Sequence, residues 1–391
     1  MSRTWGSAAP SGRKQRLAFG GASVNRKNFI GRTARRTFTS VLAGLEAALI
    51  EPGIFSFATR LAGNGKQWPK SMNSLPSSFR RPLLGRPQVS ALRNAGTLLS
   101  KLLIVCALPL TLRAAENSVT APGAQLEKLA GDFEFTEGPA SDAQGNVFFT
   151  DQPNDRILKW STEGKLTTFM QPCGRANGLS FDAAGNLWAC ADETNALWRI
   201  APGGEITVVV KDYRGKLLNG PNDVWCRPGG GLYFTDPYYK RPYWKRGAKE
   251  QPECVYYLPA NPVDLRLVID DLKQPNGIIG TPDGKTLYVA DIGAGKTYRY
   301  RIQPDGSLKE KQLFCEMGSD GMTIDSEGNI YITGKGVTVF DPSGRKIEQI
   351  EVPDKWTANV CFGGKERQTL FITASKSFYG IKTRVKGVDS Q

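Results

Sequence analysis

Residues 142–151 have the sequence DAQGNVFFTD, a polar turn followed by an apolar strand. The turn places Gly145 beside Asn146, and both residue types readily adopt the positive φ values of a tight turn between two strands. The same unit recurs five times, as DAAGNLWACAD (182–192), RPGGGLYFTD (227–236), PDGKTLYVAD (282–291), DSEGNIYITG (325–334) and the degenerate GGKERQTLFITA (363–374). Self-similarity of this kind is typical of a repeat architecture.

The spacing of the repeats indicates the type of unit. The turn glycines Gly145, Gly185, Gly230, Gly284 and Gly328 are separated by 40, 45, 54 and 44 residues. Each apolar strand is followed by a strand with aromatic or basic residues, such as RILKWS (156–161), and then by an outer strand, such as KLTTFM (165–170). Four antiparallel strands in roughly 40–50 residues form a propeller blade. No segment beyond residue 115 shows helical periodicity, so we predict an all-β, six-bladed β-propeller.

The sixth unit supplies only three strands, in TANVCFG (357–363), TLFITAS (369–375) and FYGIKTRV (378–385). The missing strand can come from Gln125–Leu129, which precedes the first unit. An N-terminal strand that completes the last blade closes the ring and hides sheet edges that would otherwise be exposed. We therefore assign residues 116–391 to one propeller domain whose folded part begins near residue 124.

The formal net charge of +14 is concentrated at the N-terminus. Residues 1–115 carry 18 Lys or Arg against two acidic residues, whereas the remaining 276 residues carry 33 Lys or Arg against 35 Asp or Glu. The basic balance therefore belongs to the N-terminal segment, and we expect no nucleic-acid partner for the propeller.

This N-terminal segment is typical of a targeting sequence. Residues 98–112 form a 15-residue apolar stretch with arginines before it and Ala114 and Ala115 after it, which is the layout of a secretory signal peptide. It is shorter than the roughly 20 residues that span a bilayer. We expect a leader at 72–115, cleaved near Ala115, and an exported protein, periplasmic or secreted, with no stable membrane insertion after cleavage. An uncleaved anchor and the absence of export are the alternatives. Residues 1–71 are expected to be disordered or an untranslated extension.

Two residue types limit the chemistry. The sequence contains no histidine, which excludes Ser-His-Asp and Cys-His nucleophiles and a His-ligated zinc site. The six cysteines beyond residue 115 are scattered and show no metal-ligand spacing. We expect most of them to be small apolar strand residues, with one disulfide possible.

An acidic or amide residue stands eight positions before each turn glycine. These residues are Glu137, Asn177, Asn222, Asn276 and Asp320, and Asn359 occupies the equivalent strand position in the sixth unit. Each lies at the start of an innermost strand, so the six should form one ring at one mouth of the central channel. Such residues are disfavoured in strands, and crowding them around an axis costs desolvation unless something compensates. Carboxylate and amide oxygens suit a hard cation such as Ca²⁺, so we predict a metal-binding ring rather than ordinary strand starts.

From about Gln125 to Lys386 the chain resembles the gluconolactonase/regucalcin-like (senescence marker protein) lactonases, whose motifs EGP, PND, NG and DGM occur here in order. The resemblance implies one axial divalent metal ion, with Ca²⁺ favoured and Mg²⁺, Mn²⁺ or Zn²⁺ also compatible. It implies the metal-site residues Glu137, Asn222, Asn276 and Asp320.

The resemblance also implies an activity, the opening of a sugar lactone or related cyclic ester by a carboxylic ester hydrolase of class EC 3.1.1. The cation would polarise the carbonyl, and Asp320 would act as general base on the attacking water. Asn222, at the edge of the metal site, and Asn177 are candidate substrate-binding residues. Arg175, two residues before Asn177, is either a further substrate contact or a surface arginine.

Alternative functions remain open at this point because fold does not determine function. One is a phosphotriesterase-like or strictosidine-synthase-like enzyme on the same scaffold. Another is a non-catalytic binding propeller with a structural metal ion.

Two local features also have two interpretations each. The aromatic and basic stretch between Tyr238 and Val255 would either steer a substrate toward the mouth or form an exposed hairpin. Asp151, Asp236 and Asp291 would either hold a second ion or terminate their strands.

Overall fold

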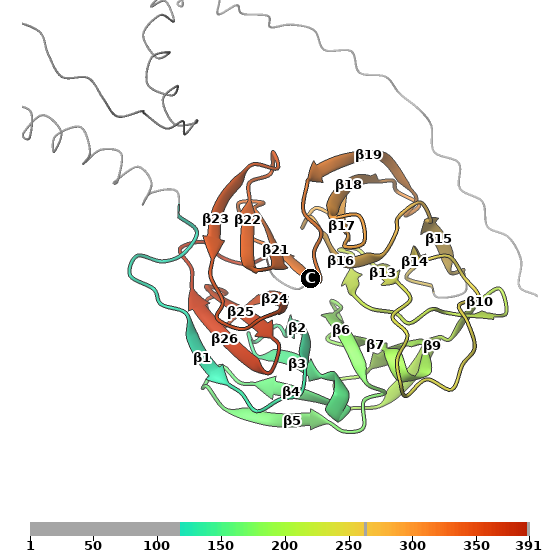
Figure 1. Cartoon of the computed structure of the whole chain (residues 1–391), viewed down its shortest axis with the longest axis horizontal. Coiled ribbons are helices and arrows are strands. Elements are labelled where there is room, and N and C mark those ends of the chain that lie inside the picture. The colour runs from blue at the N-terminus through green and yellow to red at the C-terminus, as the bar shows by residue number, and fades with distance from the viewer. Residues whose placement is uncertain (1–117, 262–263, 389–391) are drawn as a thin grey trace, which may run out of the picture. The chain divides into compact units, whose positions relative to one another are not determined.

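The computed structural model describes residues 118–261 and 264–388, so the expected extension and leader at 1–115 lie outside the described residues. The described chain forms six four-stranded antiparallel sheets arranged around a central axis (Figure 1). The predicted six-bladed β-propeller is therefore confirmed. Among the described residues, no helix has the length and apolar character needed to cross a membrane.

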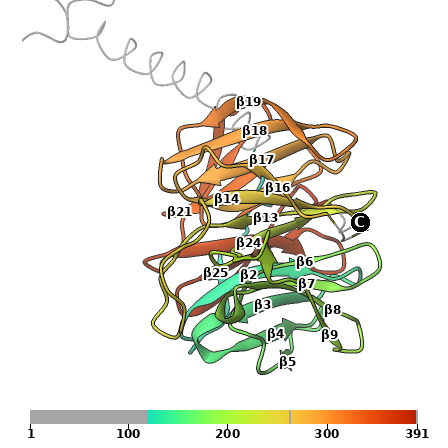
Figure 2. The same cartoon turned by 90° about the vertical axis from the view of Figure 1, so that its right-hand side faces the viewer.

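Each blade runs from an innermost strand outward, as Figure 2 shows for β16 to β19. Blade one comprises β2 (Thr136–Ser141), β3 (Val147–Asp151), β4 (Arg156–Trp160) and β5 (Leu166–Met170). Blade two comprises β6 (Ala176–Phe181), β7 (Leu187–Ala191), β8 (Ala196–Ile200) and β9 (Ile206–Val210). Blade three comprises β12 (Val224–Cys226), β13 (Leu232–Asp236), β14 (Cys254–Leu258) and β15 (Arg266–Ile269).

The second half of the ring repeats this order. Blade four comprises β16 (Pro275–Gly280), β17 (Thr286–Asp291), β18 (Lys296–Ile302) and β19 (Leu308–Cys315). Blade five comprises β20 (Met322–Ile324), β21 (Ile330–Gly334), β22 (Gly336–Phe340) and β23 (Lys346–Ile350). Blade six comprises β24 (Thr357–Gly363), β25 (Thr369–Ala374), β26 (Ser377–Lys382) and β1 (Glu127–Ala130). A small hairpin, β10 (Asp212–Tyr213) and β11 (Lys216–Leu217), follows blade two.

The repeated turn holds the two inner strands of a blade in register. In blade one the Asp142 Oδ1 atom accepts hydrogen bonds from the backbone N–H groups of Gln144 and Asn146, at 3.0 and 2.9 Å. Gly145 then adopts a φ of 90°, a conformation that a residue with a side chain rarely adopts. The hydrophobic core lies between blades, where Phe148 meets Phe181 of the next blade edge-on at 5.1 Å. The six described cysteines are buried and unpaired.

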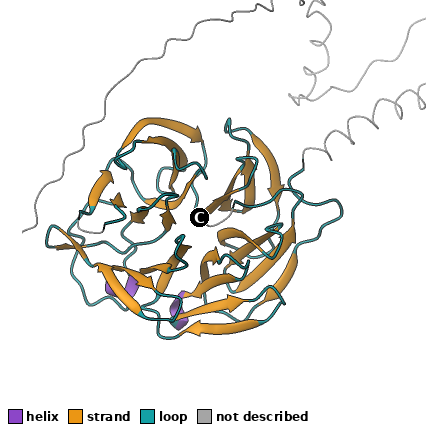
Figure 3. Cartoon of the chain, turned by 180° about the vertical axis from the view of Figure 1, so that it is seen from behind, coloured by secondary structure: helices purple, strands orange, loops and turns teal. Residues whose placement is uncertain are grey.

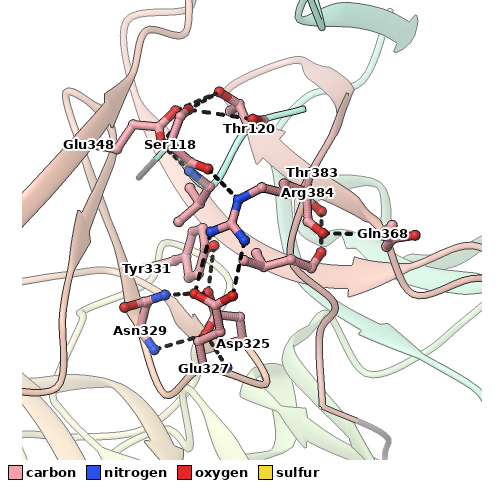
Figure 4. Close-up of polar contacts among 12 residues, drawn as sticks. Ser118, Thr120, Asp325, Glu327, Asn329, Tyr331, Glu348, Gln368, Thr383 and Arg384 are labelled. Carbon is pink, nitrogen blue, oxygen red and sulfur yellow. Dashed lines mark hydrogen bonds and ion pairs between the residues drawn. The ribbon is translucent and has the colours of Figure 1, made fainter. Parts of the chain in front are cut away.

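The N-terminal strand closes the ring as the sequence predicts, because β1 pairs antiparallel with β26. The fold begins earlier than the expected residue 124. Glu348 of β23 accepts hydrogen bonds from the Val119 N–H at 2.6 Å and the Thr120 hydroxyl at 2.7 Å (Figure 4). Arg384 binds the Ser118 carbonyl oxygen at 3.0 Å. Residues 118–120 are thus hydrogen-bonded to blade five, through Glu348, and to the segment that follows β26 of blade six, through Arg384.

The last described residues reach the central channel. Gly387 forms a bridge with Asp325 of blade five, and a Cβ atom on Gly387 would lie only 2.1 Å from the Phe362 Cβ atom. Val388 lines a cavity of about 130 Å³ together with the distal parts of the inner strands, including Ala140 and Phe181. The C-terminal segment therefore fills one end of the channel.

Candidate active site

The six predicted ring residues lie at the starts of the six innermost strands. Glu137, Asn177, Asn276 and Asn359 lie within the first residues of β2, β6, β16 and β24, while Asn222 and Asp320 lie two residues before the start of β12 and β20. Five of the six are buried, and Asp320 is partly exposed. The constant spacing from each turn therefore places these residues at equivalent positions around the axis.

Glycines let neighbouring inner strands approach closely at this level. A Cβ atom on Gly178 would lie 2.5 Å from the Asn222 carbonyl oxygen and 2.4 Å from the Asp223 Oδ1 atom. A Cβ atom on Gly321 would lie 1.9 Å from the Asn359 side chain. The glycine that follows most of the ring residues is therefore required by packing, and it brings consecutive blades into contact at the mouth.

Asp320 and Asn276 form the best-defined part of the ring. The Asn276 Nδ2 atom donates a hydrogen bond to Asp320 Oδ1 at 2.8 Å. The other Asp320 oxygen, Oδ2, accepts a hydrogen bond from the Trp356 indole N–H at 2.7 Å. Both carboxylate oxygens are thus held by donors from neighbouring blades, and the carboxylate has one defined orientation.

Glu137 adds a second buried carboxylate to the same site. Its Oε2 atom accepts the Gly138 N–H at 2.8 Å, and its side chain is 2% exposed. Burial raises the pKa of Glu137 well above its usual range, and the negative charges of Asp320 and Asp223 raise it further. Burial also raises the pKa of Asp320. Two acidic groups share a poorly solvated site, so the ionised form needs a positive partner.

The donor set fits a hard cation. The Asn276 Oδ1 atom is buried and has no hydrogen-bond partner among the described residues. An unpaired buried amide oxygen is costly, and it lies in the same cluster as the two carboxylates. Within 118–261 and 264–388 no three His, Cys, Asp or Glu side chains group as a metal site, so amide oxygens would have to contribute. Oxygen-only ligation of this kind matches Ca²⁺ or Mg²⁺.

Asp223 is a third carboxylate near the axis, and it was not singled out from the sequence. Its Oδ2 atom lies 3.5 Å from the Asn359 Nδ2 atom, and burial raises its pKa to about 8. Asp223 belongs to the PND motif (221–223), in which the spacing from the turn glycine indicates Asn222 as the ring residue. Asp223 follows Asn222 directly, and only the structure shows that its side chain also lies near the axis.

The three predicted substrate contacts lie in different settings. Asn177 and Asn222 belong to the ring: the Asn177 carbonyl oxygen accepts the Thr150 hydroxyl at 3.1 Å, and the Asn222 carbonyl oxygen accepts the Gly178 N–H at 2.7 Å. Arg175 lies on the rim, where its guanidinium donates to the Pro153 carbonyl oxygen and covers the Tyr243 ring at 4.7 Å. Their roles toward a substrate remain predictions.

The stretch between Tyr238 and Val255 is not a hairpin, since residues 237–253 contain no strand. It is a long connection from β13 to β14 that returns to the mouth. The Tyr239 hydroxyl oxygen accepts a hydrogen bond from Asn276 Nδ2 at 2.9 Å, and Arg241 Nε contacts Asp192 Oδ2 at 3.1 Å. The hairpin interpretation is therefore wrong: the aromatic and basic side chains pack on neighbouring blades rather than on a partner strand.

The aspartates that end the second strands bind backbone groups. Asp236 accepts the N–H groups of Asn219 and Gly220, each at 2.8 Å. Asp151 and Asp291 accept equivalent N–H groups ahead of β2 and β16. The three aspartates therefore have a structural role: each holds, by hydrogen bonds to backbone N–H groups, the segment that leads into the innermost strand of its blade. The same end of blades one and two carries the 3-10 helices η1 (Gln152–Asn154) and η2 (Asp192–Thr194), drawn purple in Figure 3.

Residues 135–376 match the family model described as the SMP-30/Gluconolactonase/LRE-like region. The chain belongs to this family. The gluconolactonase of Zymomonas mobilis is 29% identical over 293 residues, which cover 67% of this chain and 82% of that protein. The Staphylococcus aureus lactonase drp35 is 26% identical and matches 64% of this chain and 79% of its own length.

A solved gluconolactonase structure from Xanthomonas campestris superposes with a TM-score of 0.64 at 29% identity, covering 68% of this chain and 91% of that one. The names of these relatives agree with the lactonase-type enzyme expected from the sequence. The family model and the curated relatives thus support family membership, and the solved structure supports the fold. The residues matched by the family model include every ring position from Glu137 to Asn359.

Proposed function

We propose that this protein is a divalent-cation-dependent lactonase that opens a sugar lactone or a related cyclic ester. The observation that carries the proposal is the pair of carboxylates at the axial mouth, the buried Glu137 and the partly exposed Asp320, beside the unpaired Asn276 Oδ1 atom. The gluconolactonase and lactonase names of its relatives support lactones as the substrate class. The substrate partner is a small molecule.

The residues that would hold the cation are Glu137, Asn276 and Asp320, with Asn222 at the edge. Their hard oxygen atoms favour Ca²⁺, while Mg²⁺, Mn²⁺ and Zn²⁺ are tested beside it. When bound, the cation would supply Lewis-acid polarisation of the lactone carbonyl. It would also neutralise the two carboxylates, whose ionisation burial opposes.

The chain itself supplies the proton acceptor. Asp320 is the ring carboxylate that remains partly exposed, and its two oxygens are oriented by Asn276 and Trp356. In this setting Asp320 takes a proton from the attacking water and later returns one to the alkoxide oxygen released from the ring. Because Val388 lines the opposite end of the channel, the substrate enters from the mouth that carries Asp320.

Replacement of Asp320 by Asn tests the general base. In the full chain, assayed on a panel of sugar lactones with Ca²⁺, Mg²⁺, Mn²⁺ and Zn²⁺ separately, D320N should lower kcat by about 10²–10⁴-fold. The Asp283→Asn variant is the control, because Asp283 is 54% exposed in a turn of blade four. Unchanged kcat in D320N would remove Asp320 as the base.

The same panel distinguishes the alternative functions. If no lactone is opened with any of the four cations, while a ligand still binds, the protein is a binding propeller rather than a lactonase. Turnover of a phosphotriester instead of a lactone would indicate a different enzyme on the same scaffold.

We also propose that the protein is exported and cleaved near Ala115, leaving a periplasmic or secreted domain. The support is the leader-like sequence at 98–115. The contacts of residues 118–120 with Glu348 would be kept in the cleaved protein. N-terminal sequencing of the protein from its native host tests this, and an intact residue 98–115 segment in the mature protein would contradict it.

A further inference from the structure

The connection between β13 and β14 brings a second group of side chains to the site. In blade one the same connection is the four-residue segment 152–155, whereas in blade three it runs from residue 237 to 253. The longer connection contains tyrosines, a tryptophan and several basic residues. Its side chains contact blade two and blade four, so it covers part of the mouth instead of extending into solvent.

Asp192 fixes this connection to blade two. Asp192 is 3% exposed, and its carboxylate accepts hydrogen bonds from Arg241 Nε at 3.1 Å and from the Tyr243 hydroxyl. The Asp192 carbonyl oxygen accepts the Trp244 indole N–H at 2.8 Å. Three side chains of one segment thus converge on one residue of η2. Multiple contacts of this kind hold a segment in one conformation, although it contains no regular secondary structure.

The segment held in this way carries Tyr239 into the ring. The Tyr239 hydroxyl oxygen accepts the Asn276 Nδ2 hydrogen at 2.9 Å, and the same Nδ2 atom donates to Asp320 at 2.8 Å. Because the hydroxyl acts as acceptor toward Asn276, its own proton is left for a different partner. None of the described residues accepts that proton. A protonated phenol therefore stands beside the general base with an unused donor.

We propose that Tyr239 is a substrate-binding and catalytic residue that donates a hydrogen bond from its hydroxyl to an ester oxygen of the bound lactone. Asp192 is its positioning residue, acting through Arg241, Tyr243 and Trp244. The proposal rests on the proposed lactonase function. Tyr239 keeps its proton throughout, since its role is to stabilise negative charge that grows on the ester oxygen while Asp320 exchanges protons with water.

The sharpest test removes only the hydroxyl. In the full chain with Ca²⁺ and D-glucono-1,5-lactone, Tyr239→Phe should lower kcat/KM by at least about tenfold, mostly through kcat, because the bond strengthens as charge develops. The matched control is Tyr238→Phe in the same connection, whose hydroxyl lies 3.5 Å from the Gly247 carbonyl oxygen. Y238F should keep wild-type kinetics. Equal kcat/KM in Y239F and wild type would overturn the proposal.

A second variant tests the positioning role. Asp192→Asn should lower kcat/KM less than Y239F does, and it should speed tryptic cleavage at Lys240 and Lys245. Combining D192N with Y239F should cost little beyond Y239F alone, since both changes disable the same hydroxyl. Full additivity of the two effects would contradict the coupling of Asp192 to Tyr239.

The outcome separates this proposal from the proposed function. If the wild-type protein opens no lactone with any tested cation, the lactonase function fails first. If wild type is active and D320N is inactive while Y239F retains full activity and the wild-type pH profile, the lactonase function stands and the role of Tyr239 is rejected. Binding of the product D-gluconate, measured calorimetrically, gives a readout independent of turnover and should weaken in Y239F but not in Y238F.

Discussion

At Asp320, two neutral donors orient a carboxylate that lies close to a second acidic group. Asn276 and Trp356 each donate to one of its oxygens, and they come from blade four and from the 351–356 connection. Hydrogen bonds to a charged acceptor are stronger than those between neutral groups. The orientation of the proposed general base therefore depends on two side chains that are not themselves proposed to react.

Trp356→Phe tests this dependence. Phenylalanine keeps an aromatic ring but cannot donate, so Asp320 Oδ2 loses its partner and the carboxylate gains rotational freedom. We expect kcat to fall about tenfold, the equivalent of one hydrogen bond to a charged group. Since Trp356 is 42% exposed, thermal stability should change little. A large fall in the melting temperature with unchanged kcat would assign Trp356 a structural role instead.

The sequence predicted the ring residues but not the residues that orient them. Glu137, Asn276 and Asp320 repeat at a constant distance from a recognisable turn, so strand periodicity alone places them on one axis. Trp356 and Tyr239 lie in connections between strands, where no repeat applies. Their positions depend on tertiary contacts, which a pattern of residues in a single sequence does not contain.

At the level of single elements, the inner strands are held at their start by side chains of the neighbouring strand. Asp236 ends β13 and binds two successive N–H groups ahead of β12, one with each carboxylate oxygen. Asp291 does the same for β16, whereas Asp151 accepts both N–H groups ahead of β2 with its Oδ1 atom. The sequence indicated that these aspartates either terminate strands or hold an ion. The structure shows how a strand terminator can also position the ring residue of the same blade.

Asp236→Asn should therefore destabilise blade three. The amide offers one oxygen where the carboxylate offers two, so one buried N–H group loses its acceptor at a cost of about 1–3 kcal/mol. Urea denaturation measures the change. Asp212→Asn is the control, because Asp212 accepts a single N–H group in the exposed β10–β11 hairpin and should change stability by less than about 0.5 kcal/mol. If the two variants lower the free energy of unfolding equally, the two buried hydrogen bonds of Asp236 do not stabilise the protein more than the single exposed one of Asp212.

At the scale of the whole propeller, the N-terminal strand closes the ring of blades at its outer edge, whereas negative charge near the central axis has no ion-pair partner among the described residues. On the outside, β1 completes blade six, and Glu348 and Arg384 fasten residues 118–120 (Figure 4). At the centre, acidic and amide side chains from different blades lie together around the axis, at the starts of the innermost strands. Closure was predictable because the sixth unit lacked a strand, whereas the extra contacts of residues 118–120 depend on a blade-five glutamate that no strand pattern singles out.

A cation that binds Glu137, Asn276 and Asp320 would join blades one, four and five, so it should stabilise the whole propeller. At a concentration 100 times its Kd, binding to the folded state alone adds about 2.7 kcal/mol. For a domain of this size the melting temperature should rise by about 5–10 °C with Ca²⁺ and fall back with a chelator. Because the pKa values of Glu137 and Asp320 are raised, protons compete as the pH falls, and the rise should be smaller at low pH than at neutral pH.

Glutamate variants provide the matched comparison for this prediction. Glu137→Gln should abolish the Ca²⁺-dependent rise, because it removes one of the two carboxylates proposed to bind the cation. Glu134→Gln should retain it, since Glu134 is exposed and pairs with Lys376 at 3.1 Å. The apo form of E137Q should also be more stable than apo wild type at high pH, because burial and the charge of Asp320 oppose ionisation of Glu137, whereas the amide stays neutral. A wild-type melting temperature that does not respond to Ca²⁺, Mg²⁺, Mn²⁺ or Zn²⁺ would show that the ring residues do not bind any of these cations.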